Sequence, residues 1–377
     1  MSDSLDRRAT VSAPAPSHVA GKGGRRFRHG LVIGTFYPPH VGHLALVRAA
    51  LSRCDRVTVE VLGGSTESIP VPLRVQWLVE EAPTARVTSV VDDAEIDFES
   101  AAAWEHHTGV IRSLLDPADG PVGAVFTSDA YGEELAHRLD AEWVRVDPER
   151  SSLTVSSTAV RRDVPGHWWA LPAAARAHLA KRVVVLGAES SGTTTLASDL
   201  ADRYGVPWVP EYVRAWAVAR PGGPGAPWQD VELDLVAQAQ AAGEDAAARR
   251  TPRPLLLCDT DVLAAAVWHQ RHVGSRSPRL EALAAQRVPD LYLLTSPDDV
   301  PLPRGAGADG ERRRAAMHEG FRQVLAARPA RWVEVAGDRE ERLARATQEV
   351  DALLARGWDL APSLEQQQHA ARRHGAT

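Results

Sequence analysis

The sequence lacks the features that mark secreted, membrane-embedded or nucleic-acid-coating proteins. Cysteine occurs only twice in 377 residues, at the distant positions Cys54 and Cys258, which argues against a disulfide framework or a zinc site and suits the reducing cytoplasm. No apolar stretch approaches the roughly 20 residues that a membrane helix needs. A basic stripe is also absent and the net charge is −6, so nucleic acid is not expected as a general partner. Anionic ligands must therefore be met locally, by loops and by individual Arg and His side chains.

The two ends of the chain differ in composition from the middle. Residues 1–29 are rich in Ser, Ala, Pro, Gly and Arg and lack the apolar core of a secretion signal, so they are predicted to form a disordered tail. The Gln- and Arg-rich end, 359–377, is predicted to be a flexible tail. The length between them suits two cores, and a Pro-rich boundary divides the chain into predicted domains at 30–167 and 168–358.

Both halves alternate short apolar runs with helix-like segments, which predicts an α/β fold with two successive parallel sheets. The strand candidates of the first half are Gly30–Ile33, Val57–Leu62, Arg86–Val91, Val122–Thr127 and Trp143–Val146. Those of the second half are Arg182–Leu186, Val206–Val209, Leu255–Cys258, Leu291–Leu294 and Trp332–Val335.

The segment Gly34–His43 reads Gly-Thr-Phe-Tyr-Pro-Pro-His-Val-Gly-His and joins a strand to a helix. Gly34 allows close backbone approach at the strand end, and the helix offers free N–H groups to an anion. His40 and His43 are three residues apart, so both rings can face one ligand and donate hydrogen bonds to phosphate oxygens that gain charge. A His-x-x-His pair alone fits a surface or metal-binding pair as well. The glycines, Phe36 and the prolines in register favour a phosphate site.

This pattern resembles the nucleotidyltransferase superfamily that includes nicotinamide mononucleotide, pantetheine-phosphate and glycerol-phosphate nucleotidyltransferases. A second motif of that superfamily, Ser-Ser-Thr-Ala-Val-Arg, occupies Ser156–Arg161; without the first motif it would be read as a helix N-cap. The resemblance implies a Rossmann-like domain in which His40, His43 and Arg161 stabilise the transferring phosphate. The residues it implies for ATP binding are Gly34, Thr35, Phe36, His40, His43, Ser128, Asp129, Ser156, Ser157, Thr158 and Arg161.

Within this set, Ser128 and Asp129 are the adenosine contacts, because they follow the fourth strand and ligands of open α/β sheets bind at strand carboxyl ends. The resemblance also places an Arg and an aromatic residue near the nicotinamide. These are Arg74 and Trp77, with Trp104 as a second aromatic candidate, since a cationic pyridinium favours an aromatic face. Both tryptophans are equally compatible with a place in the core.

The second half begins with a strand followed by Gly-Ala-Glu-Ser-Ser-Gly-Thr-Thr-Thr over Gly187–Thr195 and then a helix, which is the context of a P-loop. Thr193 stands where the P-loop lysine is expected, and Thr194 stands where a hydroxyl would bind Mg²⁺. A plain strand–helix turn is the alternative. The expected ATP contacts of this half are Gly187, Glu189, Ser190, Ser191, Gly192, Thr193, Thr194, Thr195 and Arg312.

Three acidic residues strengthen the P-loop interpretation. Asp259 and Asp261 end an apolar strand as a Walker B carboxylate would, and Asp259 could hold Mg²⁺ with Thr194 or take a proton from a sugar hydroxyl. Glu211 ends the second strand of this half, where small-molecule kinases bind their acceptor. We therefore expect Glu211, Asp259 and Asp261 to bind a ribosyl substrate.

The order of the two motifs resembles the NadR type of enzyme, which joins an adenylyltransferase to a ribosylnicotinamide kinase and uses ATP and Mg²⁺. The resemblance implies a first half that makes NAD from nicotinamide mononucleotide, and a P-loop kinase-like second half that makes the mononucleotide from ribosylnicotinamide. The missing lysine is a departure. Another cation would have to replace it, either Arg214 or an arginine of the loop Asp299–Arg313, where the candidates are Arg304, Arg312 and Arg313.

Three alternatives stay open at the level of sequence: a monofunctional adenylyltransferase whose P-loop half only senses nucleotide, a nucleotidyltransferase for another phosphate acceptor, and a non-catalytic NAD-responsive regulator. Some members of the NadR type carry an N-terminal helix-turn-helix. The low-complexity start of this chain does not predict one, so neither DNA nor a membrane is an expected partner. Oligomeric state and preference for the amide or acid pyridine are open.

Overall fold

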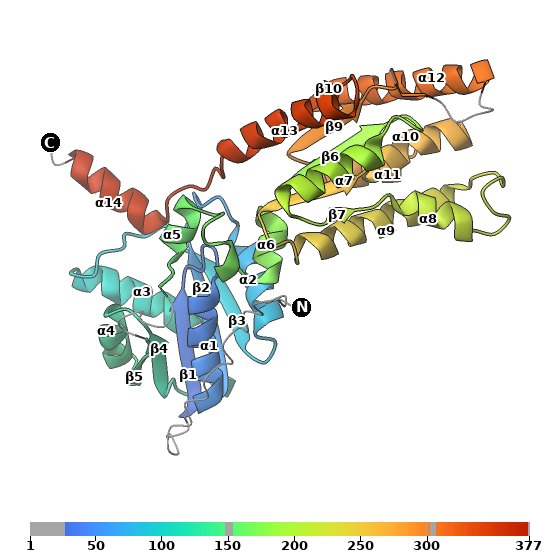
Figure 1. The fold of residues 1–377 in the computed structure, drawn as a ribbon. Helices are drawn as coiled ribbons and strands as arrows, with labels where there is room; N and C mark the ends of the chain where they lie inside the picture. The colour runs from blue at the N-terminus through green and yellow to red at the C-terminus, as the bar shows by residue number, and fades with distance from the viewer. Residues whose placement is uncertain (1–26, 148–153, 299, 302–306, 376–377) are drawn as a thin grey trace, which may run out of the picture.

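The computed structural model describes residues 27–147, 154–298, 300–301 and 307–375, and it contains one parallel five-stranded sheet in each half (Figure 1). The predicted α/β class with two successive parallel sheets is confirmed. Almost all of the predicted N-terminal tail lies outside the described residues, as does Arg304 of the predicted lid. None of the helices found in the described ranges is long and apolar enough to cross a bilayer.

The elements of the first half alternate as the apolar runs predict. They are β1 (Phe27–Gly34), α1 (Val41–Arg53), β2 (Cys54–Gly63), α2 (Val71–Glu81), β3 (Arg86–Val91), α3 (Ala101–Leu114), β4 (Ala124–Thr127), α4 (Tyr131–Arg138), β5 (Glu142–Arg145) and α5 (Ser157–Arg162).

The second half repeats the alternation with longer helices. Its elements are α6 (Ala173–Leu179), β6 (Lys181–Gly187), α7 (Thr193–Tyr204), β7 (Trp208–Val209), α8 (Tyr212–Ala219), α9 (Asp230–Ala248), β8 (Leu255–Asp259), α10 (Val262–Val273), α11 (Pro278–Gln286), β9 (Leu291–Thr295), α12 (Gly307–Ala326), β10 (Trp332–Val335), α13 (Arg339–Ala355) and α14 (Leu364–Gly375).

Strand order fixes where ligands can bind in each sheet. The first sheet has the order β3-β2-β1-β4-β5 and the second has the order β10-β9-β6-β8-β7, with parallel pairing throughout. The order therefore reverses at β1 in the first sheet and at β6 in the second. In such sheets the crevice beyond the carboxyl ends of the strands at the reversal is the usual ligand site. Gly34 and Gly187 end these two strands.

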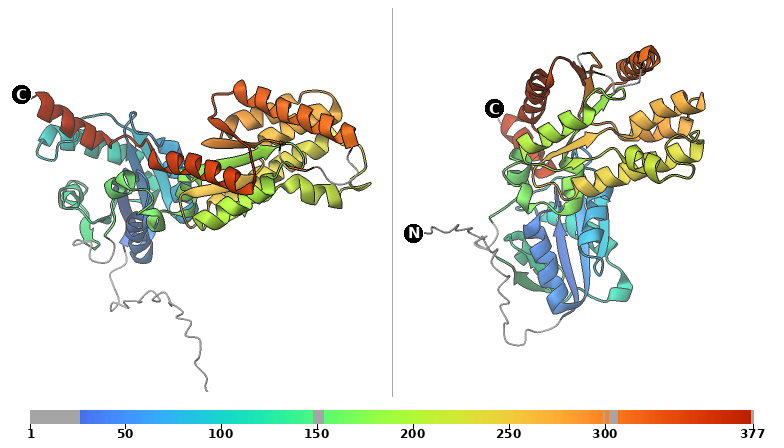
Figure 2. Two further views of the ribbon diagram at one scale, coloured as in Figure 1. Left: turned by 45° about the horizontal axis from the view of Figure 1, so that its top comes forward. Right: turned by 45° about the vertical axis from the view of Figure 1, so that its right-hand side comes forward.

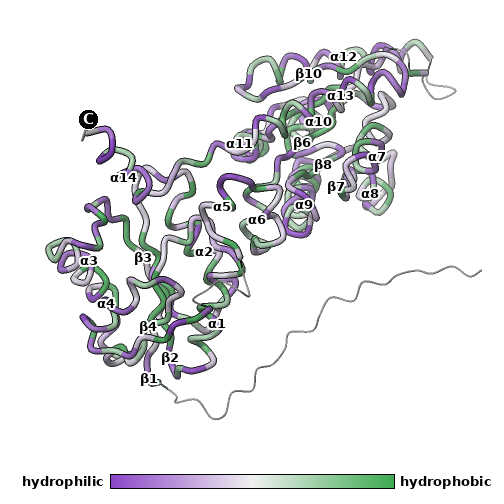
Figure 3. Tube along the Cα trace, turned by 60° about the vertical axis from the view of Figure 1, so that its left-hand side comes forward, coloured by the Kyte–Doolittle hydropathy of each residue, from purple (hydrophilic) through white to green (hydrophobic). Residues whose placement is uncertain are grey.

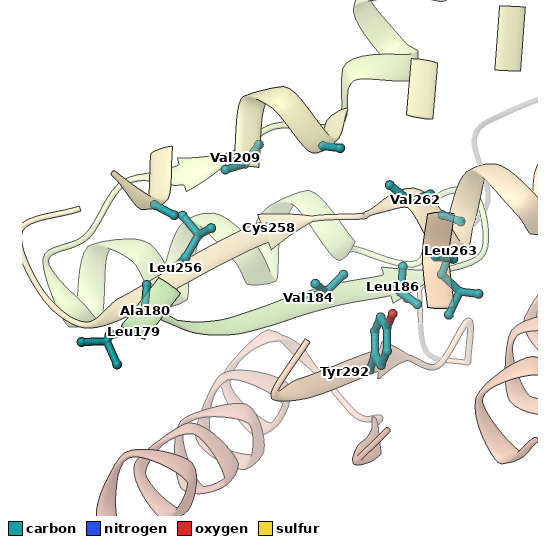
Figure 4. Packing of buried hydrophobic residues seen from close by; sticks show 14 of the residues in the cluster. Leu179, Ala180, Val184, Leu186, Val209, Leu256, Cys258, Val262, Leu263 and Tyr292 are labelled. Carbon is teal, nitrogen blue, oxygen red and sulfur yellow. The ribbon is translucent and has the colours of Figure 1, made fainter. Parts of the chain in front are cut away.

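Each sheet is covered by helices on both faces, so its strands are nearly continuous apolar runs. In Figure 3 the strands of both halves follow hydrophobic stretches of the chain, whereas α14 is largely hydrophilic. Figure 4 shows side chains of three strands of the second half on a common core: Val184 and Leu186 of β6, Leu256 and Cys258 of β8, and Tyr292 of β9. These residues are almost completely inaccessible to solvent.

The two halves share part of one hydrophobic core. Trp77 on α2 belongs to the same buried cluster as α6 and the second sheet, and its ring lies 5.4 Å from that of His178. Trp168 in the connecting segment donates its indole N–H to the carbonyl of Thr251 (2.9 Å). On the surface, Arg249, the C-cap of α9, forms a salt bridge with Glu80 of α2.

The end of the chain differs from the sequence-based expectation. A flexible tail is predicted over 359–377, but the structure contains α14 there, and this helix lies against the first half (Figures 1 and 2), on the segments that follow β2 and β3. The amide of Ser363, the residue before α14, donates to the side chain of Gln366 (3.1 Å). In a capping box, the side chain at the third helical position accepts the N-cap amide in this way. The helix therefore has a local start signal and a docking surface.

Candidate functional site

The two motifs of the first half line one cavity of about 210 Å³ at the carboxyl ends of β1 and β4. Its wall is formed by the turn after β1, the first turns of α1, the residues after β4 and β5, and α5. The predicted residues that line it are Thr35, His40, His43, Ser128, Asp129, Ser156, Ser157, Thr158 and Arg161. Segments that are far apart in the sequence are thus brought together around one cavity.

The backbone determines the tautomer of both histidines. His40 is the N-cap of α1 and accepts the amide of Gly42 at Nδ1 (3.1 Å), while His43 accepts the amide of His40 at Nδ1 (3.3 Å). A neutral imidazole that accepts at Nδ1 carries its proton on Nε2. The rings stack with centroids 3.8 Å apart. His40 and His43 therefore offer Nε2–H donors from the cavity wall without needing a positive charge.

Arg161 is held against the turn of the first motif. Its Nη1 donates to the carbonyl of Tyr37 (2.6 Å), and its guanidinium lies over the ring of Tyr37, 4.7 Å from the centroid. Nearby, the hydroxyl of Ser157 donates to the carbonyl of Pro38 (3.1 Å), and Ser156 caps α5 by accepting the amide of Ala159 (3.1 Å). These bonds tie α5 to the turn before α1, which places a fixed cation beside the two imidazoles.

Two predicted ATP contacts support the cavity from behind. Gly34 ends β1, and Phe36 is fully buried with its ring edge-on to His43 at 4.9 Å. Phe36 adopts a positive φ of 47°, which turns the chain sharply between strand and helix. Both residues shape the turn, and the structure does not place them on the cavity wall.

Arg74, predicted to contact nicotinamide, is buried beneath the cavity. Its Nη2 forms a salt bridge with Glu67 (2.6 Å), and its Nη1 donates to the carbonyl of Thr35 (2.8 Å). Its guanidinium also lies over the ring of Tyr37 at 4.7 Å. Tyr37 is thus in cation–π contact with both Arg74 and Arg161. Arg74 therefore stiffens the first motif.

Neither of the two tryptophans predicted near the nicotinamide lines the cavity. Trp77 is buried between the halves, because it lies on the face of α2 that packs on α6. Trp104 of α3 packs on the core, donates its indole N–H to the carbonyl of Phe98 (2.9 Å) and lies beneath the guanidinium of Arg138. Trp77 thus has the core position that the sequence left open, whereas Trp104 is only partly buried.

The sequence did not indicate the two C-terminal residues on this wall. Ser363 and Glu365, at the start of α14, line the cavity together with the two motifs. The Ser-x-x-Gln pattern at Ser363–Gln366 is a helix-start signal that was readable in the sequence. The long-range docking of this helix was not.

A larger cavity, of about 820 Å³, lies at the carboxyl end of β6 in the second half. Eight predicted residues line it: Gly187, Glu189, Ser190, Gly192, Thr193, Thr194, Thr195 and Glu211. Two of them have positive φ angles, 60° at Ser190 and 88° at Gly192. Left-handed residues of this kind occur in the turns whose backbone amides form anion-binding nests.

The hard-oxygen ligands that Mg²⁺ prefers are present beside the loop. The hydroxyl of Thr194 donates to Asp259 at the end of β8, so a hydroxyl and a carboxylate lie in contact at the phosphate loop. Burial raises the pKa of Asp259 above its usual range, although hydrogen bonds from Thr194 and Thr193 counteract it. A divalent cation would stabilise the ionised carboxylate. The donor set therefore fits Mg²⁺.

Of the arginines that the sequence suggested as replacements for the lysine, Arg214 lies at the P-loop cavity. It lines the cavity, donates to the hydroxyl of Thr194 (3.3 Å) and forms a salt bridge with Glu211 (2.8 Å). Burial raises the pKa of Glu211, the Arg214 guanidinium lowers it, and the carboxylates of Asp259 and Glu189 raise it further. The net shift is upward. Glu211 is thus a carboxylate with increased affinity for protons at the cavity edge.

Besides Asp259, which contacts Thr194, three predicted residues of the second half do not line this cavity. Ser191 is buried, with its hydroxyl 2.6 Å from that of Thr295. Asp261 is the buried N-cap of α10, and it accepts the amide of Leu263 and the hydroxyl of Tyr292. Arg312 is exposed on α12 and paired with Asp309. The first two support the fold beneath the site, and Arg312 lies away from it.

The second cavity also contains side chains that the sequence did not single out. Trp268, Arg271 and His272 of α10 line it together with Trp228. Their helix shows an ordinary amphipathic pattern, so no local motif distinguishes them. They bring aromatic surface and a second arginine to the side of the cavity that faces α10.

Comparisons with known proteins agree with this arrangement. A family profile described as an AAA domain matches residues 182–342, which contain the P-loop. The chain is 25% identical over 280 residues to the trifunctional NAD biosynthesis/regulator protein NadR of Escherichia coli (strain K12), an alignment covering 70% of this chain and 68% of that relative. The same values hold for the protein of that name from Salmonella typhimurium (strain LT2).

Two solved structures have a similar fold. A crystal structure of NadR protein in complex with NR has a TM-score of 0.67 at 19% identity and covers 90% of this chain and 100% of its own. One of NadR protein in complex with NAD and AMP-PNP has the same TM-score and identity and covers 88% and 97%. The arrangement of a Rossmann-like half followed by a P-loop half is therefore shared along nearly the whole described chain.

Proposed function

We propose, from the homology of this chain to the NadR proteins, that it is an enzyme of NAD biosynthesis with two activities. The first half, over 30–167, adenylylates nicotinamide mononucleotide with ATP. The second half, over 168–358, phosphorylates ribosylnicotinamide with ATP and so supplies the substrate of the first. The mutual placement of the first-half motifs and the relatives' named role in NAD biosynthesis support this proposal.

In the first reaction a phosphate oxygen of the mononucleotide attacks the α-phosphorus of ATP. The new P–O bond forms as the bond to the β-phosphate breaks, and pyrophosphate leaves with the bonding electrons. No side chain has to act as nucleophile. The Nε2–H groups of His40 and His43 and the guanidinium of Arg161 act as preset donors to oxygens that gain charge in the transition state. Ser156, Ser157 and Thr158 bind the polyphosphate, and Ser128 and Asp129 bind the adenosine.

The observation that carries this proposal is the convergence of His40, His43 and Arg161 on a single cavity from two distant motifs. The test is direct: purified protein is incubated with nicotinamide mononucleotide, ATP and Mg²⁺, and NAD is measured. Pantetheine phosphate and glycerol phosphate are tested as acceptors in parallel. NAD formation together with pyrophosphate is the expected result. Faster pyrophosphate release with either other acceptor would reassign the substrate.

In the second reaction a ribosyl hydroxyl attacks the γ-phosphorus of ATP, and ADP leaves as the bond between the β and γ phosphates breaks. Glu211, with its raised pKa, is suited to take the hydroxyl proton. Thr194 and Asp259 would hold Mg²⁺, which when bound offsets the negative charge of the phosphates. Arg214 supplies the fixed positive charge that the absent lysine would give.

The kinase proposal has a specific rival, supported by Thr193 at the lysine position. In that rival the second half binds nucleotide without turnover. The test uses the full-length His43→Ala variant, in which the first reaction is disabled, so that mononucleotide made by the second half accumulates. Mononucleotide and ADP in equal amounts support the kinase. ATP binding without either product supports the sensor.

A further inference from the structure

The last helix of the chain contacts the first-half site although it follows the second half in sequence. After α13 the chain turns back to the first half (Figures 1 and 2), where α14 contacts the segments that follow β2 and β3. The hydroxyl of Tyr37, in the first motif, donates to the carbonyl of Ala361 (3.0 Å), and the amide of Ala361 donates to Ser68 (2.8 Å). The contact therefore begins at the turn that carries the first motif.

The start of α14 fits a surface made for it after β2. A methyl group added at Gly64 would lie 2.9 Å from Cβ of Leu364, so the close approach of this leucine requires a glycine. The amide of Leu364 donates to Oε1 of Glu67 (3.3 Å), and Glu67 is itself buried against Arg74. A carboxylate at a helix N-terminus satisfies free amides and opposes the positive end of the helix dipole.

The middle of α14 is held by the loop after β3. Gln368 accepts the amide of Ile96 (2.8 Å) and donates to the carbonyl of Ala94 (3.0 Å), and Arg372 pairs with Glu95 (3.0 Å). This loop is itself fixed, because Asp92 accepts the amide of Ala94. Contacts on two separate segments of the first half define the position of α14 along its length.

Gln366 is where this docking reaches the reactive groups. Its Oε1 accepts from Nη2 of Arg161 (2.7 Å) and from the amide of Ser363 (3.1 Å). Its Nε2 donates to Oγ1 of Thr158 (3.1 Å). One carboxamide thus bridges two side chains of the second motif. As an uncharged acceptor it fixes the guanidinium without cancelling the positive charge that a phosphate needs.

We propose that α14 is a working part of the first-half site and that Gln366 is a positioning residue for Arg161 and Thr158. This inference rests on the proposed adenylyl transfer and extends it. Arg161 is a long side chain that loses much rotamer entropy on ordering, and Gln366 supplies that ordering before ATP binds. Ser363 and Glu365, which line the same cavity, complete the wall.

The decisive variant is Gln366→Glu. It keeps the shape, the capping-box contact and an acceptor for Arg161, but it adds a carboxylate that neutralises the guanidinium. We expect the KM for ATP in NAD formation to rise about tenfold or more, because the new carboxylate competes with the phosphates of ATP for Arg161. This is the scale of losing one hydrogen bond to a charged group. The melting temperature should be unchanged. Gln367→Glu is the matched control and is expected to behave like the wild type, since Gln367 contacts Thr66 and Pro362 instead.

Gln366→Ala is the second variant, and it is expected to raise the KM for ATP and lower kcat. Wild-type kinetics in both Gln366 variants would overturn the proposal and leave α14 with a structural role alone. Higher activity than wild type would also overturn it and identify the contact as autoinhibitory.

Calorimetric titration with AMP-PNP separates failure of this inference from failure of the proposed function. If the wild type makes no NAD, the adenylyl-transfer proposal fails. The inference still predicts weaker AMP-PNP binding to the first-half site in Gln366→Glu than in Gln367→Glu, because the P-loop site is identical in both proteins. Equal titration curves would overturn it independently of any turnover.

Discussion

The two cavities of this chain differ in the charged groups that surround them. In the first half, His40, His43 and Arg161 surround the cavity as donors whose orientation is set by backbone amides and carbonyls. In the second half, Glu211 and Asp259 stand beside the loop, and Arg214, with 66% of its side chain exposed, is the charged donor that contacts Thr194.

On the proposed function, this difference indicates where each half would obtain its transition-state stabilisation. A buried, preset donor acts without reorganisation and is therefore effective. An exposed arginine is screened by solvent and has to be ordered by the ligand. On the proposed function, the donors of the first half are therefore ordered before substrate arrives, whereas the second half would depend on Mg²⁺ held by Thr194 and Asp259 and on the ordering of Arg214.

The largest effect is expected at the preset donors. His43→Ala should lower the kcat of NAD formation by about 10²–10³-fold, the scale of removing one oxyanion-type donor, while phosphorylation of ribosylnicotinamide is unchanged. The measurement is the rate of each reaction with the full-length protein. His137→Ala, at an exposed histidine of α4, is the control. A loss of both activities would mean that the halves are not separate sites.

A smaller but clear effect is expected at the exposed cation of the second half. Arg214→Ala should lower the kcat of ribosylnicotinamide phosphorylation by about 10–100-fold, because the variant lacks the charged donor that contacts Thr194. Arg312→Ala should leave the rate within about twofold, since Arg312 is paired with Asp309 away from the cavity. If Arg312→Ala proves the more damaging variant, the predicted lid arginine and not Arg214 replaces the lysine.

Restoring the lysine would make the two halves more alike. Thr193→Lys is expected to raise kcat/KM for ATP in the kinase reaction about tenfold, by adding a fixed positive charge near the β and γ phosphates. Thr193→Met has similar length without charge and should not raise it. A Lys variant slower than wild type would indicate that the hydroxyl of Thr193 on Asp259 is needed more than the charge.

Buried carboxylates also differ between the halves, and this difference gives a pH-dependent prediction. Asp261 has hydrogen-bond partners, whereas neither oxygen of Glu60, buried on β2, has one within the described part of the chain. Burial raises the pKa of Glu60 from 4.5 to about 8. The folded state therefore binds more protons than the unfolded state between these values, and stability falls as the pH rises from 4.5 through about 8.

Glu60→Gln removes this ionisation. The variant should melt a few degrees above wild type at pH 9 and lose that advantage near pH 5. The measurement is the melting temperature across this range, with the exposed Glu99→Gln as control. A constant difference at every pH would mean that the ionisation of Glu60 contributes nothing.

Sequence patterns predicted the fold and the two motifs of the first-half cavity, because both depend on local signals. Apolar runs defined the strands, and the Gly-x-Phe-x-Pro-x-His-x-Gly-His pattern defined one strand–turn–helix unit. The carboxyl ends of parallel strands meet at one edge of a sheet, so the convergence of Gly34–His43 with Ser156–Arg161 followed from topology. The chemical roles of these residues remain predictions.

What the sequence did not reveal depends on tertiary contacts. Asp259 and Asp261 look equivalent in Asp-Thr-Asp, but Thr260 between them has a φ of 74°, so one carboxylate meets the P-loop and the other caps α10. Trp77 and Arg74 lie three residues apart on one helix, and only packing shows that they support the site from the core. Gly64 and Glu67 form the surface on which α14 docks, and they precede that helix by roughly 300 positions in the sequence.

The return of α14 to the first half has a consequence for the order in which the protein is made. A ribosome releases β1 to α5 long before it reaches Gln366, so the nascent first half has to wait for the entire second half before its last helix can dock. A chain cut short after α13 would carry both motifs of the first-half cavity, but Arg161 would lack its hydrogen bond to the carboxamide of Gln366. Completion of the first-half site is thereby coupled to synthesis of the second half.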